Sequence, residues 1–357
     1  MRDLVTELAL GLRRHVLPYL GSHAERAHVR AGAGGDVTFA IDRKAEQYLE
    51  SFLAERAPGM AFYSEDRGLV EPSGGRGTQN MADDLQARGG AEGAEGAKPP
   101  CRVSGGATAE RDALSGGTTS AQVLVVDPID GTRPALAGLE SACVSVAAAA
   151  LGDGEPCMRD VHTGCIVEIK SGVLFVAERG GGIEIRNPDG SAGVPRLSPN
   201  TDLGSLFWTL GFRGRPALPL VRVLEELIDS SSVGGGVFDL GSATYDMTRI
   251  VTGQLDAYLD VGPRMIEEVP SLRERFEAVG GGAVLNNSPY DLAAAALCLE
   301  EAGAIVTDAY GEPLGHRPLL GSGHDYQMSC LSASNDRLHQ LLLEALERGF
   351  HGLGRSH

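Results

Sequence analysis

Asp127-Pro128-Ile129-Asp130-Gly131-Thr132 is the stretch of sequence that decides the expected fold, and it follows the strand-like run VLVV of residues 123–126. Pro128 cannot donate to a strand ladder, so the strand is predicted to end at Asp127 and the chain to turn. The turn can bring Asp130 beside Asp127, and two carboxylates at short range repel each other unless a cation lies between them. The Ile129 carbonyl would add another hard oxygen, and oxygen-only ligands favour Mg²⁺ over zinc or copper. The hexapeptide therefore predicts a magnesium site at the end of a strand.

The same residues also have an ordinary structural explanation. Two aspartates separated by two residues often form an Asx-type turn that caps a helix and binds no metal. Short motifs also match by chance. Gly131 favours the metal site, because a residue without a side chain lets the backbone approach a ligand closely. Motifs elsewhere in the chain are therefore needed to distinguish a metal site from a helix-capping turn.

DPIDGT (127–132) resembles the signature of the inositol monophosphatase and fructose-1,6-bisphosphatase superfamily, the Mg²⁺-dependent, lithium-sensitive phosphatases. Other segments resemble further motifs of this superfamily and occur in its order: DVTFAIDRKAE (36–46), FYSED (62–66), GSATYDMTRIVTGQLDAYLD (241–260) and PYDLAAAALCLEEAGAIVTD (289–308). Separated motifs in one order are more specific than any single motif. The resemblance covers most of the chain outside residues 72–121. It implies an α+β or α/β fold, the layered α-β-α-β-α sandwich of these sugar phosphatases.

The resemblance also implies roles for individual residues. The metal ligands would be Glu65, Asp127, Asp130, Asp291 and the carbonyl of Ile129, holding two or three Mg²⁺ ions. The residues that hold the attacking water would be Asp42 and Thr132. The substrate-binding residues would be Gly131, Thr132, Gly241, Ser242, Ala243 and Asp260, the last contacting a substrate hydroxyl.

Each acidic residue, taken alone, has a structural alternative. Glu65 could be a solvated loop acid, and Asp291 could complement the dipole of a helix that begins near it. Asp42 could be a helix N-cap. Asp260 could be a surface acid on an edge strand. The metal-site interpretation depends on all of them occurring together with DPIDGT.

The chain departs from the family pattern at several positions. Asp66 stands where the family usually has a second glutamate, Tyr290 where it has Trp, and Ala295 where it has Gly. None of these changes removes a predicted metal-binding carboxylate. Two extra stretches, 72–121 and roughly 264–287, could reshape access to the site. These two stretches bear on the identity of the natural substrate more than on the type of reaction.

Hydrophobic periodicity predicts two successive regions. An amphipathic N-terminal helix, a helix over 42–57 and several strands up to about residue 186 come first; helices over 217–229, 243–252, 291–302 and 334–348 alternate with short strands afterwards. We expect a division near residue 195, into an N-terminal region 1–195 that carries most metal ligands and a C-terminal region 196–357. Residues 72–121 are rich in Gly and poor in large apolar residues, which predicts a flexible insertion.

Composition excludes several classes of protein. The chain has 357 residues with 31 Lys+Arg against 48 Asp+Glu, a formal net charge of −17. Such a charge argues against nucleic acid and anionic membranes as partners. No apolar run is long enough for a membrane span. The six cysteines lie far apart without a C-x-x-C pair, which predicts reduced thiols and a cytoplasmic protein. The resemblance adds the expectation of a homodimer.

The predicted function is hydrolysis of the phosphate monoester of a small sugar, cyclitol or nucleoside phosphate by a metal-activated water. Two alternatives stay open at this point. One is a 3′-phosphate nucleotidase of the same fold, acting on adenosine bisphosphate-type substrates. The other is a non-catalytic paralogue that only binds metal or ligand, because resemblance in fold does not prove activity.

Overall fold

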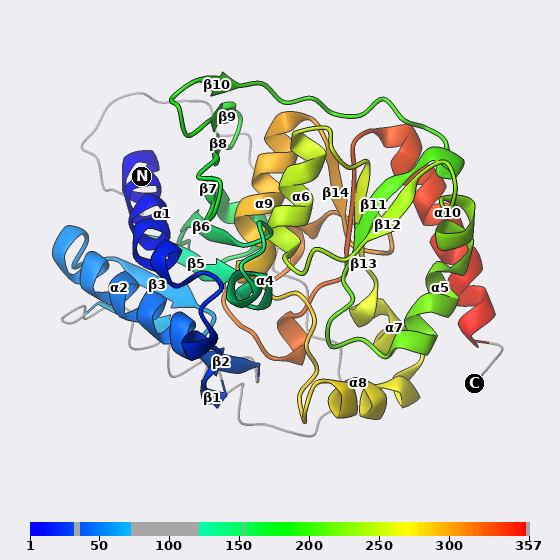
Figure 1. Ribbon diagram of the computed structural model, residues 1–357, viewed down its shortest axis with the longest axis horizontal. Coiled ribbons are helices and arrows are strands. Elements are labelled where there is room, and N and C mark those ends of the chain that lie inside the picture. Colours follow the sequence, from blue (N-terminus) through cyan, green and yellow to red (C-terminus); the bar gives the residue numbers. More distant parts are fainter. Residues whose placement is uncertain (32–35, 73–120, 153, 355–357) are drawn as a thin grey trace.

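The computed structural model describes residues 1–31, 36–72, 121–152 and 154–354. Its strands form an eight-stranded sheet in the order β10-β9-β8-β7-β6-β5-β3-β4, a five-stranded sheet in the order β12-β11-β13-β15-β14, and a small β1–β2 sheet (Figure 1). The strands are β1 (His28–Ala31), β2 (Val37–Phe39), β3 (Ala61–Ser64), β4 (Gly68–Val70), β5 (Gln122–Asp130), β6 (Cys143–Ala150), β7 (Val161–Glu168), β8 (Leu174–Glu178), β9 (Gly182–Arg186), β10 (Ala192–Gly193), β11 (Phe207–Leu210), β12 (Gly236–Phe238), β13 (Ala257–Asp260), β14 (Ile305–Thr307) and β15 (Cys330–Ala333). The helices are α1 (Arg2–Val16), α2 (Ala40–Arg56), α4 (Thr132–Ala137), α5 (Ala217–Ser230), α6 (Ala243–Val251), α7 (Gly262–Glu268), α8 (Arg273–Val279), α9 (Pro289–Ala302) and α10 (Asp336–Gly354).

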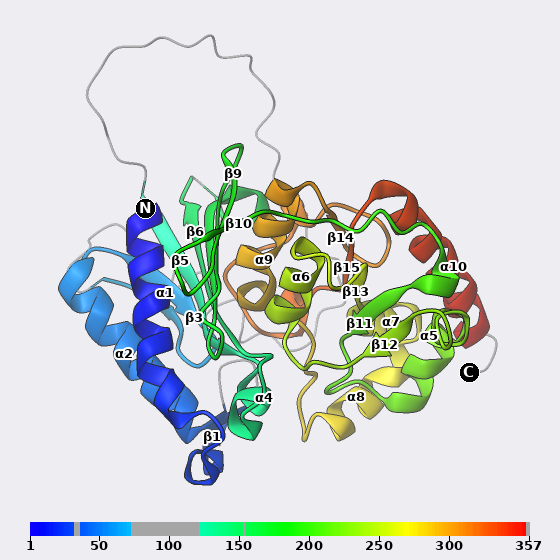
Figure 2. The same cartoon turned by 45° about the horizontal axis from the view of Figure 1, so that its top comes forward.

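Helices α1 and α2 cover one face of the eight-stranded sheet (Figure 2). Leu8, Leu12 and Val16 recur at helical spacing in α1 and are fully buried. Helix α2 begins after Phe39, whose backbone N–H is bonded by the Asp42 side chain in the first turn. The predicted helix over 42–57 therefore corresponds to α2, which begins two residues earlier.

Helices α6 and α9 form the middle layer, between the two sheets (Figure 2). Helix α9 is small-residue-rich and almost entirely buried, so it approaches the large sheet closely. A Cβ atom at Gly164 of β7 would lie 3.0 Å from the Ala294 carbonyl oxygen. Glycine at this strand position thus permits the close helix–sheet contact.

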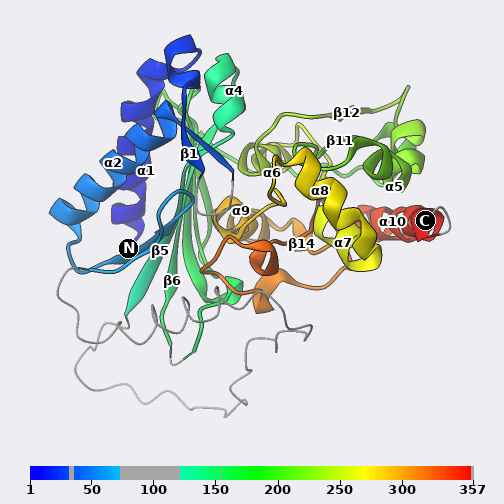
Figure 3. The ribbon, with the colours of Figure 1, turned by 90° about the horizontal axis from the view of Figure 1, so that it is seen from below.

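Helices α5 and α10 form the outer layer and cover the five-stranded sheet. The fully buried Trp208 of β11 lies in this core, and its Nε1 donates to the Ser231 hydroxyl at 3.0 Å. Viewed from below, the helix and sheet layers follow one another across the molecule (Figure 3). The predicted α-β-α-β-α sandwich is confirmed.

Several local expectations were incomplete or wrong. Strand β5 does not stop at Pro128 but continues to Asp130, and its register with β6 shifts between Asp127 and Asp130. The irregularity accommodates the missing N–H of Pro128. The extra stretch 264–287 contains most of α7 and all of α8. The strands of the eight-stranded sheet all precede the predicted boundary at 195, and those of the five-stranded sheet all follow it. The division of the chain into two separable regions stays a prediction.

Some expectations lie partly or wholly outside what the structure describes. The predicted flexible insertion 72–121 falls on residues that are not described, apart from its ends. Among the described cysteines, Cys143, Cys165, Cys298 and Cys330 are free and buried, whereas Cys157 is disulfide-bonded, so the expectation of reduced thiols throughout was wrong. Across the described residues, every helix is too short or too polar to cross a bilayer. A cytoplasmic location stays a prediction.

Candidate metal and phosphate site

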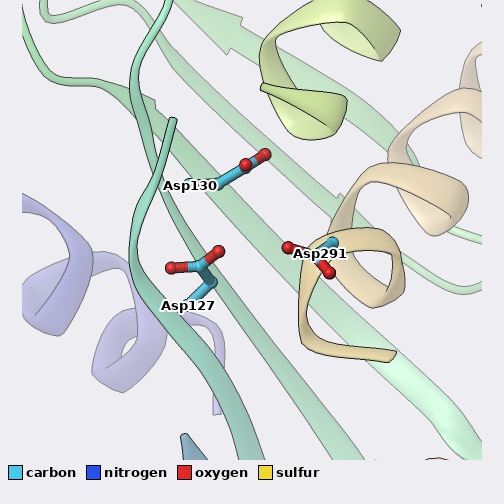
Figure 4. A group of neighbouring side chains, drawn as sticks. All are labelled: Asp127, Asp130 and Asp291. Carbon is cyan, nitrogen blue, oxygen red and sulfur yellow. The ribbon is translucent and has the colours of Figure 1, made fainter. Parts of the chain in front are cut away.

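The end of β5 places two aspartates close together. Asp127 and Asp130 are 1% and 7% exposed. The backbone N–H of Ile129 donates to Asp127 Oδ1 at 2.9 Å, which closes the turn between them. The register shift in β5 lets both side chains leave the strand on the same side, toward α9 (Figure 4).

Asp291 completes a group of three carboxylates. It lies in the first turn of α9, where its Oδ2 accepts from the backbone N–H of Ser288 at 2.6 Å. One oxygen from each of Asp127, Asp130 and Asp291 lies within 4.8 Å of the others (Figure 4). Asp291 is therefore both the helix-capping acid of the structural alternative and a member of the cluster.

The three carboxylates disfavour one another's charge. Burial raises the pKa of Asp127 well above its ordinary value, and the carboxylates of Glu65, Asp130 and Asp291 raise it further. Burial and Asp130 raise the pKa of Asp291 to about 8. Among the described residues, no arginine or lysine forms an ion pair with any of the three aspartates. A cation between them would relieve this repulsion, and the all-oxygen donor set fits Mg²⁺.

Glu65 lies near this cluster, at the end of β3. Strands β3 and β5 are parallel neighbours, so their carboxyl ends meet at the same edge of the sheet. Burial raises the pKa of Glu65 well above its ordinary value, with further contributions from Asp42 and Asp291. The structure thus brings the four predicted carboxylate ligands together around one cavity.

Thr132 and Asp42 form a hydrogen-bonded pair beside the cluster. The Thr132 hydroxyl lies 3.0 Å from Asp42 Oδ1 and 3.1 Å from the Ile129 carbonyl oxygen. Asp42 Oδ2 accepts from the Phe39 backbone N–H at 2.8 Å, so this carboxylate both caps α2 and orients Thr132. Burial raises the pKa of Asp42 to about 7, and Asp66 adds to the rise.

Two glycines let backbone segments meet at the site. Gly131 has φ +86°, and a Cβ atom there would lie 2.5 Å from the Ser141 carbonyl oxygen. Gly241 has φ +78° and its Cβ would lie 3.0 Å from Pro134. Both positions require glycine on conformational and steric grounds.

The segment that follows Gly241 holds Asp130 in place. The Ser242 hydroxyl donates to Asp130 Oδ2 at 2.8 Å, and the Thr244 backbone N–H donates to the same oxygen at 2.6 Å. Ser242 also caps α6 by accepting from the Tyr245 N–H. The role of Thr244 could not be predicted from the sequence, because no residue pattern links a backbone amide to a carboxylate more than a hundred positions away.

Asp260 lies apart from the cavity. It is fully buried, forms an ion pair with Arg215, and accepts from the Gly262 backbone N–H at 3.0 Å. Arg215 lines a small polar cavity next to Ser242, Ala243 and Asp291. In this structure, Asp260 therefore orients an arginine. Its direct contact with a substrate hydroxyl stays a prediction.

A cavity of about 530 Å³ opens over the carboxylates. Its volume is in the range of small-molecule sites. Its lining includes the predicted residues Glu65, Asp127, Ile129, Asp130, Gly131, Thr132, Gly241 and Asp291. It also includes Asp36, Arg133, Phe212 and Arg213, to which the sequence analysis gave no role. For Arg133, the only sequence signal was its place directly after Thr132.

Comparisons with known proteins agree with this geometry. A model of the inositol monophosphatase family matches residues 1–349. The fructose-1,6-bisphosphatase/inositol-1-monophosphatase of Methanothermobacter thermautotrophicus is 27% identical over 308 residues, covering 85% of this chain and 94% of that protein. The inositol-1-monophosphatase of Caulobacter vibrioides is 24% identical over 349 residues, covering 97% and 99%.

A solved structure shows the same fold. The inositol monophosphatase of Anabaena (Nostoc) sp. PCC 7120 superposes with a TM-score of 0.57 at 18% identity, over 97% of this chain and 95% of that one. The family match spans nearly the whole chain, and the resemblance predicted from the sequence is confirmed. The chain belongs to the inositol monophosphatase family.

Proposed function

We propose that this protein is a Mg²⁺-dependent phosphatase that hydrolyses the phosphate monoester of a small sugar, cyclitol or nucleoside phosphate. The observation that carries the proposal is the group of three carboxylates within 4.8 Å beside the Thr132–Asp42 pair. Both lie where the family's phosphatases would need a metal site and a water-orienting pair. Family membership supports the reaction class, and the intact carboxylates argue against a non-catalytic paralogue.

Asp127, Asp130, Asp291, Glu65 and the Ile129 carbonyl would hold two or three Mg²⁺ ions. The Ile129 carbonyl oxygen lies 3.1 Å from the Thr132 hydroxyl and keeps a lone pair available for a ligand bond. Bound Mg²⁺ would supply electrostatic stabilisation of the phosphoryl group and a more acidic water. This chemistry needs no cysteine or histidine nucleophile.

The protein's own groups would position the reactants. The Thr132 hydroxyl donates to Asp42 and leaves its oxygen lone pairs free to accept from a water. Gly131 and Thr132 line the cavity, and their backbone amides would donate to phosphate oxygens. Ser242 and Thr244 fix Asp130, which holds one wall of the site rigid.

A phosphate-release screen tests the proposal directly. The panel contains inositol, sugar and nucleoside monophosphates and adenosine 3′,5′-bisphosphate, each with and without Mg²⁺ and Li⁺. We expect release that requires Mg²⁺ and is inhibited by Li⁺. Failure to release phosphate from any compound, together with retained Mg²⁺ binding by calorimetry, would instead support a non-catalytic paralogue.

One observation favours the nucleotidase as a second candidate. Phe212 is 41% exposed and lines the cavity, as do Leu139 and Leu240. An aromatic ring in such a position can stack on a nucleobase. Higher kcat/KM for adenosine 3′,5′-bisphosphate than for any sugar phosphate in the panel would decide for this candidate.

We also propose a homodimer. Phe207 and Phe238 stack with their ring centroids 6.5 Å apart and are 43% and 40% exposed. They line a second cavity with Leu139 and Leu255, so this side of the molecule presents exposed apolar surface. Light scattering after size exclusion tests this assembly, and a monomeric mass at micromolar concentration would contradict it.

A further inference from the structure

One buried arginine joins three segments around the main cavity. Arg215 donates through Nε and Nη2 to the two oxygens of Asp260, at the end of β13, and its Nε lies 3.3 Å from Asp260 Oδ1. Its Nη1 donates to the Leu285 carbonyl oxygen at 2.9 Å and to the Arg213 carbonyl oxygen. The Arg215 side chain is only 5% exposed. Arg215 therefore ties β13 to the loop after β11 and to the end of the extra stretch 264–287.

The extra stretch is folded onto the body of the protein. Met265 and Phe276 are fully buried in the core of the outer layer. Near the end of the stretch, Gln327 Nε2 donates to the Val284 carbonyl oxygen at 2.6 Å, and Asn286 Nδ2 donates to Gln327 Oε1 at 3.2 Å. Gln327 thus fixes the last residues of the stretch.

The loop after β11, residues 211–216, lies directly on two of these segments. A Cβ atom at Gly211 would lie 2.8 Å from Asp260 Cγ. Gly214 has φ +77°, and a Cβ atom there would lie 2.7 Å from the Leu285 carbonyl oxygen. Glycine permits both close approaches. The path of the loop therefore depends on where β13 and the extra stretch lie.

This loop forms part of the wall of the main cavity. Phe212 and Arg213 line the cavity of about 530 Å³ and also the adjoining polar cavity of about 70 Å³. Asn286 and Asn287, at the end of the extra stretch, line the smaller cavity as well. In the proposed reaction the carboxylates and their metal ions hold the phosphate. The wall formed by the loop and the end of the stretch is then left for the rest of the substrate, which is the leaving group.

Asp260 acts in this arrangement through Arg215. Its Oδ1 accepts from the Gly262 backbone N–H at 3.0 Å as well as from Arg215, and its Oδ2 accepts from Arg215. Asp260 is fully buried and lines neither cavity. The ion pair is thus placed to hold the loop. Direct contact of Asp260 with a substrate hydroxyl is the competing role.

We propose that the extra stretch is a specificity element for the leaving group. Through Arg215, a positioning residue, it fixes the loop that carries Phe212 and Arg213 and so sets which leaving groups the cavity accepts. Phe212 offers an aromatic face, which favours a ring-containing leaving group. This inference rests on the proposed phosphatase function and deepens it.

Leaving groups of two sizes test the proposal. In the presence of Mg²⁺, kcat/KM is measured for inositol 1-phosphate, fructose 1-phosphate and adenosine 3′-phosphate, and for glycerol 1-phosphate, whose three-carbon leaving group fills less of the cavity. We expect the natural protein to prefer at least one ring compound. In Arg215→Met, kcat/KM for that compound should fall about 10- to 100-fold, mainly through KM, because the wall that it contacts is displaced. Values for glycerol 1-phosphate should stay close to those of the natural protein.

Two further variants separate specificity from stability. Gln327→Met loosens the end of the stretch, although Gln327 lines neither cavity, and should lower the same preference by less than Arg215→Met does. Arg317→Met leaves the buried Asp308 without its cation elsewhere in the fold and should leave the preference intact. Equal losses for ring compounds and glycerol 1-phosphate in Arg215→Met would overturn the proposal. No preference for any ring compound in the natural protein would overturn it as well.

A double variant distinguishes the two roles of Asp260. If Asp260 acts through Arg215, then Asp260→Asn, Arg215→Met and the double variant should lose the preference to similar extents, because each breaks the same linkage. A loss in Asp260→Asn with the natural preference kept in Arg215→Met would show direct contact with the substrate and overturn the positioning role.

Hydrogen exchange keeps this inference apart from the phosphatase proposal. The Gly211 N–H donates to the Leu259 carbonyl oxygen at 2.8 Å, and the amides of 211–216 should exchange faster in Arg215→Met and Gln327→Met than in the natural protein. Faster exchange without phosphate release from any compound would sink the phosphatase proposal and retain the link between the stretch and the loop. Phosphate release with unchanged exchange in both variants would do the reverse.

Discussion

Buried carboxylates occur in two kinds of surroundings in this molecule. At the contact between β7 and α6, Glu168 is 3% exposed and forms an ion pair with Arg249. At the end of β5, Asp127 and Asp130 are also buried, yet among the described residues no arginine or lysine forms an ion pair with them. The first arrangement satisfies its charge within the chain. The second leaves charge to be satisfied by something that the chain must bind.

The difference indicates that the aspartates at the end of β5 lower the stability of the metal-free protein in exchange for the capacity to bind a cation. A buried charge without a partner disfavours the folded state, and the raised pKa values of Asp127 and Asp291 express that cost. The Glu168 carboxylate, in contrast, has the Arg249 guanidinium as a partner within the chain. Substitutions in the two regions should therefore act in opposite directions on stability, and the following predictions use that contrast.

The largest effect is expected for Asp127→Asn. The amide keeps the shape of the side chain but removes a ligand charge, so Mg²⁺-dependent turnover should fall by several orders of magnitude. Because one source of repulsion is also removed, the variant should unfold at a higher temperature than the natural protein in EDTA. Phosphate release and differential scanning fluorimetry measure the two effects. Near-normal release by this variant would contradict the assigned site.

The opposite result is expected for Arg249→Met. The change leaves Glu168 buried without its partner, which should lower the free energy of unfolding by about 3–5 kcal/mol. Urea denaturation measures the loss. The matched control is Arg348→Ala, which breaks an exposed pair with Glu226 and should change stability by about 1 kcal/mol or less. Equal effects of the two variants would show that burial does not distinguish these ion pairs.

The sequence was sufficient to predict the carboxylates of the proposed metal site, but not the residues that hold those carboxylates in place. DPIDGT indicated Asp127, Asp130 and a nearby cation because the chemistry lies within six consecutive residues. The other predicted ligands, Glu65 and Asp291, lie in only two further segments, and the resemblance supplied the order of those segments. The positions of Thr244 and Arg213 at the site were not predicted, because they depend on loops that bring distant residues together. A single sequence does not reveal such pairings.

The errors have local physical causes. Pro128 was expected to end β5, but the register shift between Asp127 and Asp130 lets the strand continue past a residue without an N–H. Strands β11 and β12 were not predicted, because they are only four and three residues long and show no clear hydrophobic alternation. The pairing of Asp260 with Arg215 was not predicted, because the two residues lie 45 positions apart in the sequence, and the contact of Asp260 with a substrate stays a prediction.

A smaller effect is expected for Ser242→Ala. The change removes the hydroxyl that donates to Asp130 and accepts from the Tyr245 N–H, while every carboxylate stays in place. Supports of this kind typically change metal affinity by about 10- to 100-fold. Titration of activity with Mg²⁺ measures the shift. Ser232→Ala, at an exposed hydroxyl that bonds a backbone carbonyl, is the control and should leave the titration unchanged.

The smallest effect is expected for pH, and it concerns Glu46 of α2, behind the site. Burial raises the pKa of Glu46 to about 7, against a hydrogen bond from the Ser64 hydroxyl at 3.0 Å. The folded state therefore binds this proton more tightly than the unfolded state, whose carboxyl has the ordinary value of 4.5. The resulting stabilisation is complete below that value and is lost as pH rises through about 7.

Metal-free protein should accordingly lose thermal stability between about pH 5 and pH 7, and Glu46→Gln should make this decline shallower, because an amide does not titrate. Asp42, with a pKa of about 7, contributes in the same direction and should account for part of the remaining slope. Melting temperatures in EDTA across this range measure both. If Glu46→Gln melts with the same pH slope as the natural protein, then Glu46 ionises normally, and the unsatisfied charge is confined to the carboxylates that face the cavity.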